Sequence, residues 1–346
     1  MDNKPILTVR GLTKHFPIRK GLFSRISGHV QAVTNVNLTL APGETLGLVG
    51  ESGCGKTTLG RTIIQLYRPT SGEIYVGDSP NLATLSNRRL LPWRRKIQMI
   101  FQDPYSSLNP RMTVGATIAE ALTIHRLARG AERWERVAEL LRAVGLDPAY
   151  MRRFPHEFSG GQRQRIGVAR ALAVSPDIII ADEPVSALDV SVQAQIVNLL
   201  MDLQDRFGLS FIFISHDLSV VGHMSHRVAV MYLGRIVEIG PKLDVFDRPM
   251  HPYTQALLLA VPRPDPTSRR RVIVLEGDVP SPVNPPGGCP FHPRCPVRQP
   301  ECSRANLQLW DVGEGHSVAC ILYQGGARRE PVSITGEALT ASHSGV

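Results

Sequence analysis

The amino-acid sequence predicts an α/β fold with a largely parallel sheet, and two observations support this prediction. Apolar runs of strand type alternate with stretches of helical periodicity over residues 6–240, the order typical of strands joined by crossover helices. These runs are apolar at nearly every position, as strands are when helices cover both faces of their sheet. The predicted strands are residues 45–49, 97–101, 178–181, 210–214 and 227–232.

Composition places the chain among ordinary folded proteins. Of its 346 residues, 42% are hydrophobic and 20% are charged, which excludes a collagen-like, coiled-coil or disordered chain. The net charge of +9 permits an anionic partner without requiring one. The apolar stretches fall far below the roughly 20 residues that span a bilayer, and the sequence does not open with a secretory signal pattern. We therefore expect a protein that acts in the cytoplasm and does not cross a membrane by itself.

The segment after the first predicted strand carries a phosphate-binding pattern. Gly50-Glu51-Ser52-Gly53-Cys54-Gly55-Lys56-Thr57 matches G-x-x-x-x-G-K-[ST] and precedes a predicted helix at 55–67. The glycines allow the backbone N–H groups to point inward, and the helix adds the positive end of its dipole. A chance glycine-rich turn is the alternative, which the flanking strand and helix disfavour. The sequence thus predicts a P-loop NTPase. The predicted nucleotide ligands in this segment are Gly50, Ser52, Gly53, Gly55, Lys56, Thr57 and Thr58.

Within this loop, Lys56 is expected to reach the β- and γ-phosphates, and the Thr57 hydroxyl to ligate Mg²⁺. Cys54 is interpreted as a small loop residue and not as a nucleophile.

Two carboxylates follow the predicted strand at 178–181. Asp182, at the carboxyl end of a buried strand, is placed to hold Mg²⁺, usually through water. Glu183 follows directly and can polarise the attacking water as a general base. Two ordinary surface acids are the alternative, which the upstream loop makes the weaker one.

A second anion-binding motif, Ser159-Gly160-Gly161-Gln162, precedes a run at 163–174 that is predicted to be a helix. Unpaired N–H groups and a serine hydroxyl at a helix N-terminus bind phosphate. Together with the P-loop and Asp182-Glu183, this motif resembles the nucleotide-binding subunits of ABC transporters. The resemblance implies a RecA-like core with a helical subdomain and an antiparallel β part. It also implies that two subunits pack head to tail, each ATP lying between the P-loop of one and the Ser-Gly-Gly-Gln motif of the other.

Further positions match the family residue by residue. Gln102 corresponds to the glutamine that contacts Mg²⁺ or the water and faces the membrane subunit, and Asp189 to the loop that crosses the dimer interface. His216 corresponds to the histidine that contacts the γ-phosphate, and Phe16 is a candidate for the aromatic that stacks on adenine. The sequence departs from the family at Phe158, where leucine is usual.

Four cysteines, Cys289, Cys295, Cys302 and Cys320, lie in a proline-rich C-terminal stretch. Without an export signal, such a quartet indicates metal ligands before disulfides. Both Zn²⁺ and a [4Fe–4S] cluster take four cysteines, and the missing C-x-x-C pairs disfavour zinc slightly. Free thiols in a loop pinned by hydrophobic contacts remain an alternative.

The cysteine segment 288–296 and the stretch 251–261 resemble the C-terminal region of ATP-binding subunits of dipeptide and oligopeptide importers. Members with this region carry a [4Fe–4S] cluster, so the resemblance favours that cofactor besides ATP and Mg²⁺. It implies a second ABC ATPase subunit (a related chain or a second copy), two integral-membrane permeases and, indirectly, an extracytoplasmic solute-binding protein. It also implies a peripheral position on the cytoplasmic face of the cell membrane.

The resemblance divides the chain into an ABC nucleotide-binding domain at 1–240, with its helical subdomain at 103–170, and a C-terminal extension at 241–325. A disordered tail is expected at 326–346.

A different class of function is a soluble ABC-type ATPase that acts on nucleic acid or ribosomes, which the positive charge would suit. Such proteins normally contain tandem cassettes or long coiled-coil insertions, whereas this chain has one motif set. Its basic groups are scattered without interleaved aromatics, unlike a nucleic-acid footprint. We therefore expect an ATPase subunit of a peptide importer with no nucleic-acid partner, while dipeptides, oligopeptides and nickel chelates all stay open as the solute.

Overall fold

The structure is a computed structural model that describes residues 4–21, 24–103, 105, 107–260, 277–326 and 330–334. The tail expected to be disordered, 326–346, lies mostly outside the described residues.

Within the described part of the chain, eight strands form the larger sheet, in the order β10-β11-β9-β8-β3-β7-β6-β5. The strands from β8 to β5 pair in parallel, and they match the five predicted strands. Their bounds are β3 Thr45–Val49, β5 Ile97–Ile100, β6 Ile178–Asp182, β7 Ser210–Ile214 and β8 Arg227–Tyr232. The antiparallel strands β9 Arg235–Pro241, β11 His316–Val318 and β10 Trp310–Gly313 extend one edge.

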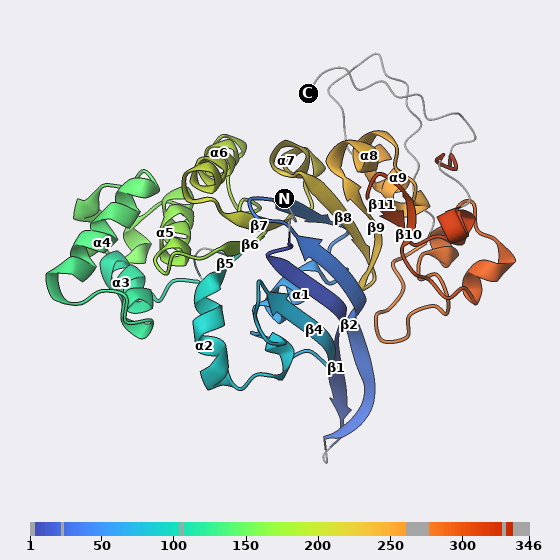
Figure 1. Cartoon of the computed structure of the whole chain (residues 1–346), viewed down its shortest axis with the longest axis horizontal. Coiled ribbons are helices and arrows are strands. Elements are labelled where there is room, and N and C mark those ends of the chain that lie inside the picture. The colour runs from blue at the N-terminus through green and yellow to red at the C-terminus, as the bar shows by residue number, and fades with distance from the viewer. Residues whose placement is uncertain are drawn as a thin grey trace.

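The two faces of this sheet bury separate cores, because successive side chains on a strand point to opposite faces. Ile179 and Ala181 join one cluster, and Ile178 and Ile180 join the other. Figure 1 shows α6 (Val190–Phe207) and α7 (Leu218–Met224) on one side of the sheet and α1 (Lys56–Ile63) on the other. Burial on both faces explains why these strands are apolar throughout.

A smaller antiparallel sheet, β2-β1-β4, completes the core on the side of α1. Its strands are β1 Leu7–Lys20, β2 Arg25–Leu40 and β4 Ser71–Val76. The antiparallel β part that the family resemblance implied is therefore present.

The segment between β5 and β6 is helical, as the sequence predicts, and forms the projection at the left of Figure 1. Its helices are α3 Val114–Ile124, α4 Gly130–Ala143 and α5 Gly160–Leu172. The helix α2, Asn87–Lys96, leads into β5.

The C-terminal region packs against the edge of the larger sheet. It contains α8 Lys242–Asp247, α9 Pro252–Leu259, short 3₁₀ turns and the strands β10 and β11. Ser317 and Val318 of β11 pair with Ile239 and Glu238 of β9. The extension thus continues the same sheet that carries the P-loop. No helix in the described ranges is long and apolar enough to cross a bilayer.

Candidate functional site

The loop between β3 and α1 has a backbone that only glycine accommodates at two positions. Gly50 has φ 150° and Gly55 has φ 108°, in a region that other residues rarely adopt. A Cβ on Gly50 would lie 2.2 Å from the Met231 carbonyl oxygen, and one on Gly55 would lie 2.1 Å from that of Ala32. The loop is therefore wedged between β8 and β2, with the N-terminus of α1 opening directly after Gly55.

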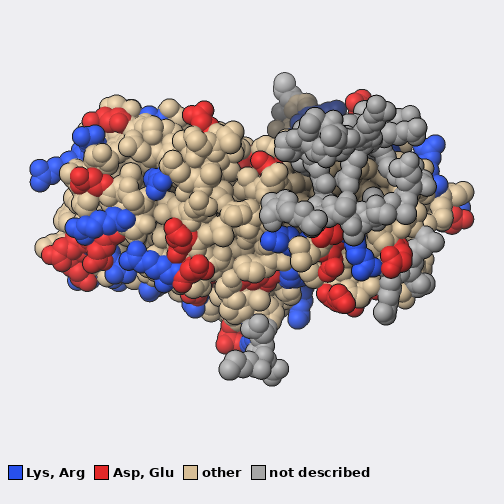
Figure 2. Space-filling model, turned by 90° about the horizontal axis from the view of Figure 1, so that it is seen from above, with Lys and Arg blue, Asp and Glu red and all other residues tan. Residues whose placement is uncertain are grey.

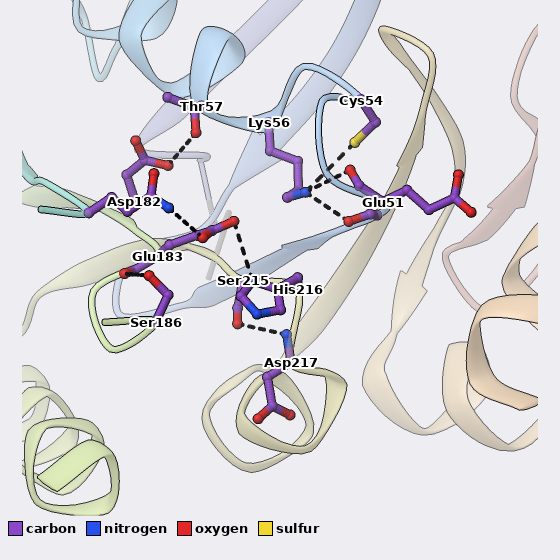
Figure 3. Close-up of polar contacts among 12 residues, drawn as sticks. Glu51, Cys54, Lys56, Thr57, Asp182, Glu183, Ser186, Ser215, His216 and Asp217 are labelled. Carbon is purple, nitrogen blue, oxygen red and sulfur yellow. Dashed lines mark hydrogen bonds and ion pairs between the residues drawn. The ribbon is translucent and has the colours of Figure 1, made fainter. Parts of the chain in front are cut away.

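The Lys56 ammonium lies inside the curve of this loop (Figure 3). Its Nζ donates hydrogen bonds to the Gly50 carbonyl at 2.7 Å and the Glu51 carbonyl at 3.0 Å. Cys54 Sγ lies 3.9 Å from the same nitrogen, but burial raises the pKa of this thiol. A protonated, buried thiol suits the interpretation of Cys54 as a loop residue.

Asp182, at the end of β6, meets Thr57, the second residue of α1. The Thr57 hydroxyl donates to Asp182 Oδ1 at 2.7 Å, whereas the buried Oδ2 has no hydrogen-bond partner and lies 3.9 Å from Arg61 Nη2. Burial raises the pKa of Asp182, and the Thr57 hydrogen bond and Arg61 oppose that shift. An orphaned carboxylate oxygen beside a hydroxyl is a donor set that fits Mg²⁺, a cation that prefers oxygen ligands.

Glu183, directly after β6, lies between residues that follow the neighbouring strands β5 and β7. Gln102 Nε2 donates to its Oε2 at 2.8 Å, and His216 Nδ1 lies 3.4 Å from its Oε1. Its φ of 44° is left-handed, and its N–H donates to the Ile214 carbonyl on β7 at 2.9 Å. A non-glycine residue held in this region indicates strain that the surrounding structure maintains. The loops after β5, β6 and β7 thus aim three side chains at one place.

These residues line a single cavity of about 410 Å³ together with the P-loop. Phe16, from β1, stands at one part of its wall, where its ring meets Tyr67 edge-on at 5.3 Å and Lys14 Nζ at 4.8 Å. An aromatic wall and a phosphate-binding loop in one cavity fit a nucleotide. The predicted residues that line it are Phe16, Ser52, Gly53, Gly55, Lys56, Thr57, Thr58, Gln102, Glu183 and His216.

The Ser-Gly-Gly-Gln motif does not line the nucleotide cavity of its own chain. Ser159 is exposed and caps α5: its Oγ accepts from the Gln162 N–H at 3.3 Å, and Gln162 Oε1 accepts from the Ser159 N–H at 3.1 Å. A Cβ on Gly161 would lie 2.5 Å from Val192 of α6, so the start of α5 packs closely on that helix. The described residues that line the cavity do not include Ser159, Gly160, Gly161, Gln162 or Asp189. The predicted nucleotide ligands therefore fall into two separate groups.

The four C-terminal cysteines line one small apolar cavity, which His251 and Phe291 also border. Burial raises the pKa of Cys289 to about 11 and that of Cys320 to about 12. Among the residues described, no three or more His, Cys, Asp or Glu side chains form a group that could hold a metal ion. The expected [4Fe–4S] or Zn²⁺ centre is thus not seen as a formed ligand set in this part of the chain.

Sequence reasoning missed the contacts among three residues at the P-loop: Glu51, Tyr253 and Arg294. Glu51 receives two hydrogen bonds from Arg294, and its N–H donates to the Tyr253 hydroxyl. Arg294 and Tyr253 lie more than 200 positions away from Glu51 in the sequence. No local pattern could have joined them.

Comparisons with known protein families give two matches. Residues 33–186 match the family described as ABC transporter. Residues 237–302 match the family described as oligopeptide/dipeptide transporter, C-terminal region.

Individual relatives cover nearly the whole chain. The oligopeptide transport ATP-binding protein AppF of Bacillus subtilis (strain 168) is 54% identical over 325 residues, which cover 93% of this chain and 98% of that protein. The probable peptide ABC transporter ATP-binding protein y4tS of Sinorhizobium fredii is 55% identical over 315 residues, covering 91% and 89%.

Solved structures of ATP-binding cassettes share the fold. The dimeric cassette MJ0796, in a post-hydrolysis state bound to ADP and Pi, superposes with a TM-score of 0.60 at 31% identity and covers 68% of this chain and 98% of that one. The cassette cbiO1 of Clostridium perfringens, part of the ABC transporter complex cbiONQ, gives a TM-score of 0.59 at 26% identity, covering 70% and 90%.

Proposed function

Since this chain belongs to the ABC transporter family, and within it to the ATP-binding proteins of peptide importers, we propose that it hydrolyses ATP to drive dipeptide or oligopeptide uptake across the cytoplasmic membrane. The observation that carries this proposal is that the predicted nucleotide-binding residues lie in two separate groups on the chain. The P-loop, Asp182, Glu183, Gln102 and His216 belong to one site, whereas Ser159 is exposed at a separate place. A chain of this kind needs a second subunit to complete its site.

Binding of ATP would begin at the P-loop. Lys56 Nζ, which now donates to the Gly50 and Glu51 carbonyls, would exchange these neutral acceptors for the β- and γ-phosphate oxygens. The N–H groups at the start of α1 add further donors to the phosphates. Phe16 offers its ring to the adenine.

Thr57 and Asp182 would hold Mg²⁺, which neutralises phosphate charge when it is bound. The unpartnered Asp182 Oδ2 supports this assignment, because a buried carboxylate oxygen without a donor is costly.

Glu183 is the proposed general base. The Gln102 amide orients the Glu183 carboxylate, which would accept the proton of the attacking water. His216, exposed beside Glu183 in the same cavity, would contact the γ-phosphate.

The second half of the site would come from a partner subunit, either a related chain or a second copy. Its Ser-Gly-Gly-Gln motif presents a hydroxyl and free N–H groups at a helix N-terminus. Ser159 is already oriented for this task by its capping hydrogen bonds with Gln162. Asp189, at the N-cap of α6, would lie at the seam between the two subunits. ATP would then join the subunits, and its hydrolysis would release them.

The remaining partners follow from peptide import: two integral-membrane permeases, on whose cytoplasmic side the ATPase dimer docks, and indirectly an extracytoplasmic solute-binding protein. On the face drawn in Figure 2, basic and acidic side chains are interspersed over the helical part at the left. Such mixing does not resemble the one-sided basic surface that nucleic-acid binding requires.

For the C-terminal region, we propose a [4Fe–4S] cluster held by Cys289, Cys295, Cys302 and Cys320. What supports it is that all four side chains line one cavity. Loss of the thiol protons on metal binding would allow the sulfurs to converge. No step of ATP hydrolysis depends on this cluster.

The test is reconstitution of the chain in proteoliposomes with two integral-membrane permeases and a second ATP-binding subunit. We expect ATP-dependent uptake of a radiolabelled dipeptide or oligopeptide, and no uptake when Glu183→Gln replaces the wild-type chain. A chain that associates with RNA or DNA in a salt-sensitive manner and never with a permease would overturn the proposal.

A further inference from the structure

The Glu51 side chain does not take part in the phosphate-binding face of the loop. Figure 3 shows its carboxylate pointing away from Lys56 Nζ. It points toward the C-terminal extension, where Arg294 forms a two-pronged ion pair with it. Arg294 Nη1 donates to Glu51 Oε2 at 2.9 Å, and Nη2 donates to Oε1 at 3.2 Å. Paired donors of this kind fix the orientation of both groups as well as their separation.

This ion pair is largely removed from solvent. The Arg294 side chain is 9% exposed and the Glu51 side chain 29%. Arg294 Nη1 also lies 3.5 Å from the Tyr232 hydroxyl oxygen, while its buried Nε has no partner among the described residues. A buried guanidinium that loses its carboxylate leaves an uncompensated charge, so the two groups hold one another in place.

A second contact from the same region fixes the backbone at Glu51. The Tyr253 hydroxyl, on α9, accepts a hydrogen bond from the Glu51 N–H at 2.8 Å. Tyr253 is fully buried, and its ring packs on Tyr232 at 4.7 Å and on Phe291 at 5.4 Å. The hydroxyl is therefore held by a rigid aromatic cluster that joins α9, β8 and the segment before Arg294.

Glu51 is consequently restrained on three sides. Its carbonyl accepts from Lys56, its N–H donates to Tyr253 and its carboxylate accepts from Arg294. When Lys56 turns to a phosphate, the two contacts from the C-terminal region remain. They keep the first half of the P-loop in the curve that presents its N–H groups.

The extension also reaches the nucleotide cavity itself. The Gln31 N–H, on β2, donates to the Pro282 carbonyl at 2.8 Å, and both residues line the cavity. The same C-terminal region therefore borders the site at two places.

We propose that Arg294 and Tyr253 are positioning residues for the nucleotide site, and that the C-terminal extension shapes the P-loop through Glu51. The proposal rests on the assignment of this site to ATP and not on the transported solute. Neither residue touches the reacting atoms, so their loss should weaken ATP binding more than it slows the chemical step.

The first test measures the Kd of ATP and the ATPase KM and kcat for Arg294→Ala in the full chain. Arg298→Ala is the matched control, since Arg298 is exposed on the same segment and its guanidinium donates to the Pro293 carbonyl at 3.5 Å and not to the P-loop. We expect the Kd and KM of Arg294→Ala to rise about five- to thirtyfold, with a much smaller change in kcat. Values equal to those of Arg298→Ala would overturn the proposal. Binding of ATP by the wild-type chain, measured in the same series, tests the site assignment separately.

The second test is a double-mutant cycle with Glu51→Gln. If Arg294 acts through Glu51, the double variant should bind ATP no more weakly than the weaker-binding single variant. Fully additive losses would show that Arg294 acts by another route and would overturn the proposal. If thermal melting shows that Arg294→Ala does not fold, the Kd of ATP for Glu51→Gln tests the proposal. A Kd equal to that of the wild-type chain would contradict the role of the ion pair.

Tyr253→Phe tests the backbone contact independently. This change keeps the ring in its aromatic cluster but leaves the Glu51 N–H without its acceptor. We expect a rise in the Kd for ATP in the same direction, in a variant that still unfolds in one cooperative transition. An unchanged Kd would remove Tyr253 from the proposal.

Discussion

The side-chain amide of Gln102 donates a hydrogen bond to the carboxylate of Glu183 at 2.8 Å, across 81 positions of sequence. This contact joins the loop after β5 to the loop after β6. Gln102 lies where the chain enters its helical segment. Movement of that segment would therefore change the position of Gln102 and, through this hydrogen bond, the orientation of the Glu183 carboxylate. A single hydrogen bond thus connects the part expected to face a permease with the residue expected to activate water.

Replacing Glu183 by glutamine should stop turnover and preserve nucleotide binding. The variant keeps the size of the side chain but cannot accept a proton, so kcat should fall by about 10² or more. We expect ATP to trap a stable dimer with the appropriate partner, detectable by size-exclusion chromatography. Glu139→Gln, an exposed change on α4, is the control. Normal hydrolysis by Glu183→Gln would refute the assignment of the base.

Replacing Asp182 by asparagine should weaken Mg²⁺ binding. The change removes the buried negative charge beside Thr57 and leaves the size of the side chain almost unaltered. A residue that holds the ion through water typically changes metal affinity by about 10–100-fold. Titration of ATPase activity with Mg²⁺ measures this shift. A titration midpoint equal to that of the wild-type chain would show that Asp182 does not serve the metal.

Ser159→Arg should separate binding from turnover. Since Ser159 is exposed and does not border the chain's own cavity, ATP should bind to the isolated chain with wild-type affinity. ATP-dependent association and hydrolysis should be lost, because the long side chain would fill the space that the γ-phosphate of the ATP bound to the partner must approach. Full-rate turnover by a strictly monomeric chain, unaffected by this change, would contradict the two-subunit site.

Cys295→Ser tests the proposed cluster. Protein purified anaerobically should contain iron and absorb visible light, and the variant should lose both properties. Cys54→Ser, outside the cysteine cavity, should retain them. A colourless, iron-free wild-type preparation would reject the cluster and favour free thiols.

The parts of this fold that could be predicted from the sequence are those with local signals. The bounds of β3, β7 and β8 were predicted to the residue, since each is a short buried run between turns. The helix after Ser159 begins at Gly160, three residues earlier than predicted. Its first turn carries two glycines, which weaken helical periodicity, but the Ser159–Gln162 capping pair compensates.

Other features could not be predicted because their determinants are distant in sequence. The register of β1 against β2 shifts at several positions, which interrupts the alternation of apolar and polar residues that marks a strand. The contact of Arg294 with Glu51 spans 243 positions and depends on how the C-terminal region folds back. The cysteines could be recognised as a set from their clustering in the sequence, whereas the cavity that they line together with His251 and Phe291 depends on how distant segments pack.

The pairing of β11 with β9 has a consequence for anyone who wishes to isolate the ATPase part. Cutting the chain after Pro241 would uncover the backbone donors and acceptors of β9 around Glu238 and Ile239. An open, apolar strand edge invites pairing with another chain. Among the described residues, the sheet instead ends on β10, a four-residue strand that carries Asp311. A shortened cassette should therefore aggregate, whereas β11 and β10 cover the β9 edge in the longer chain.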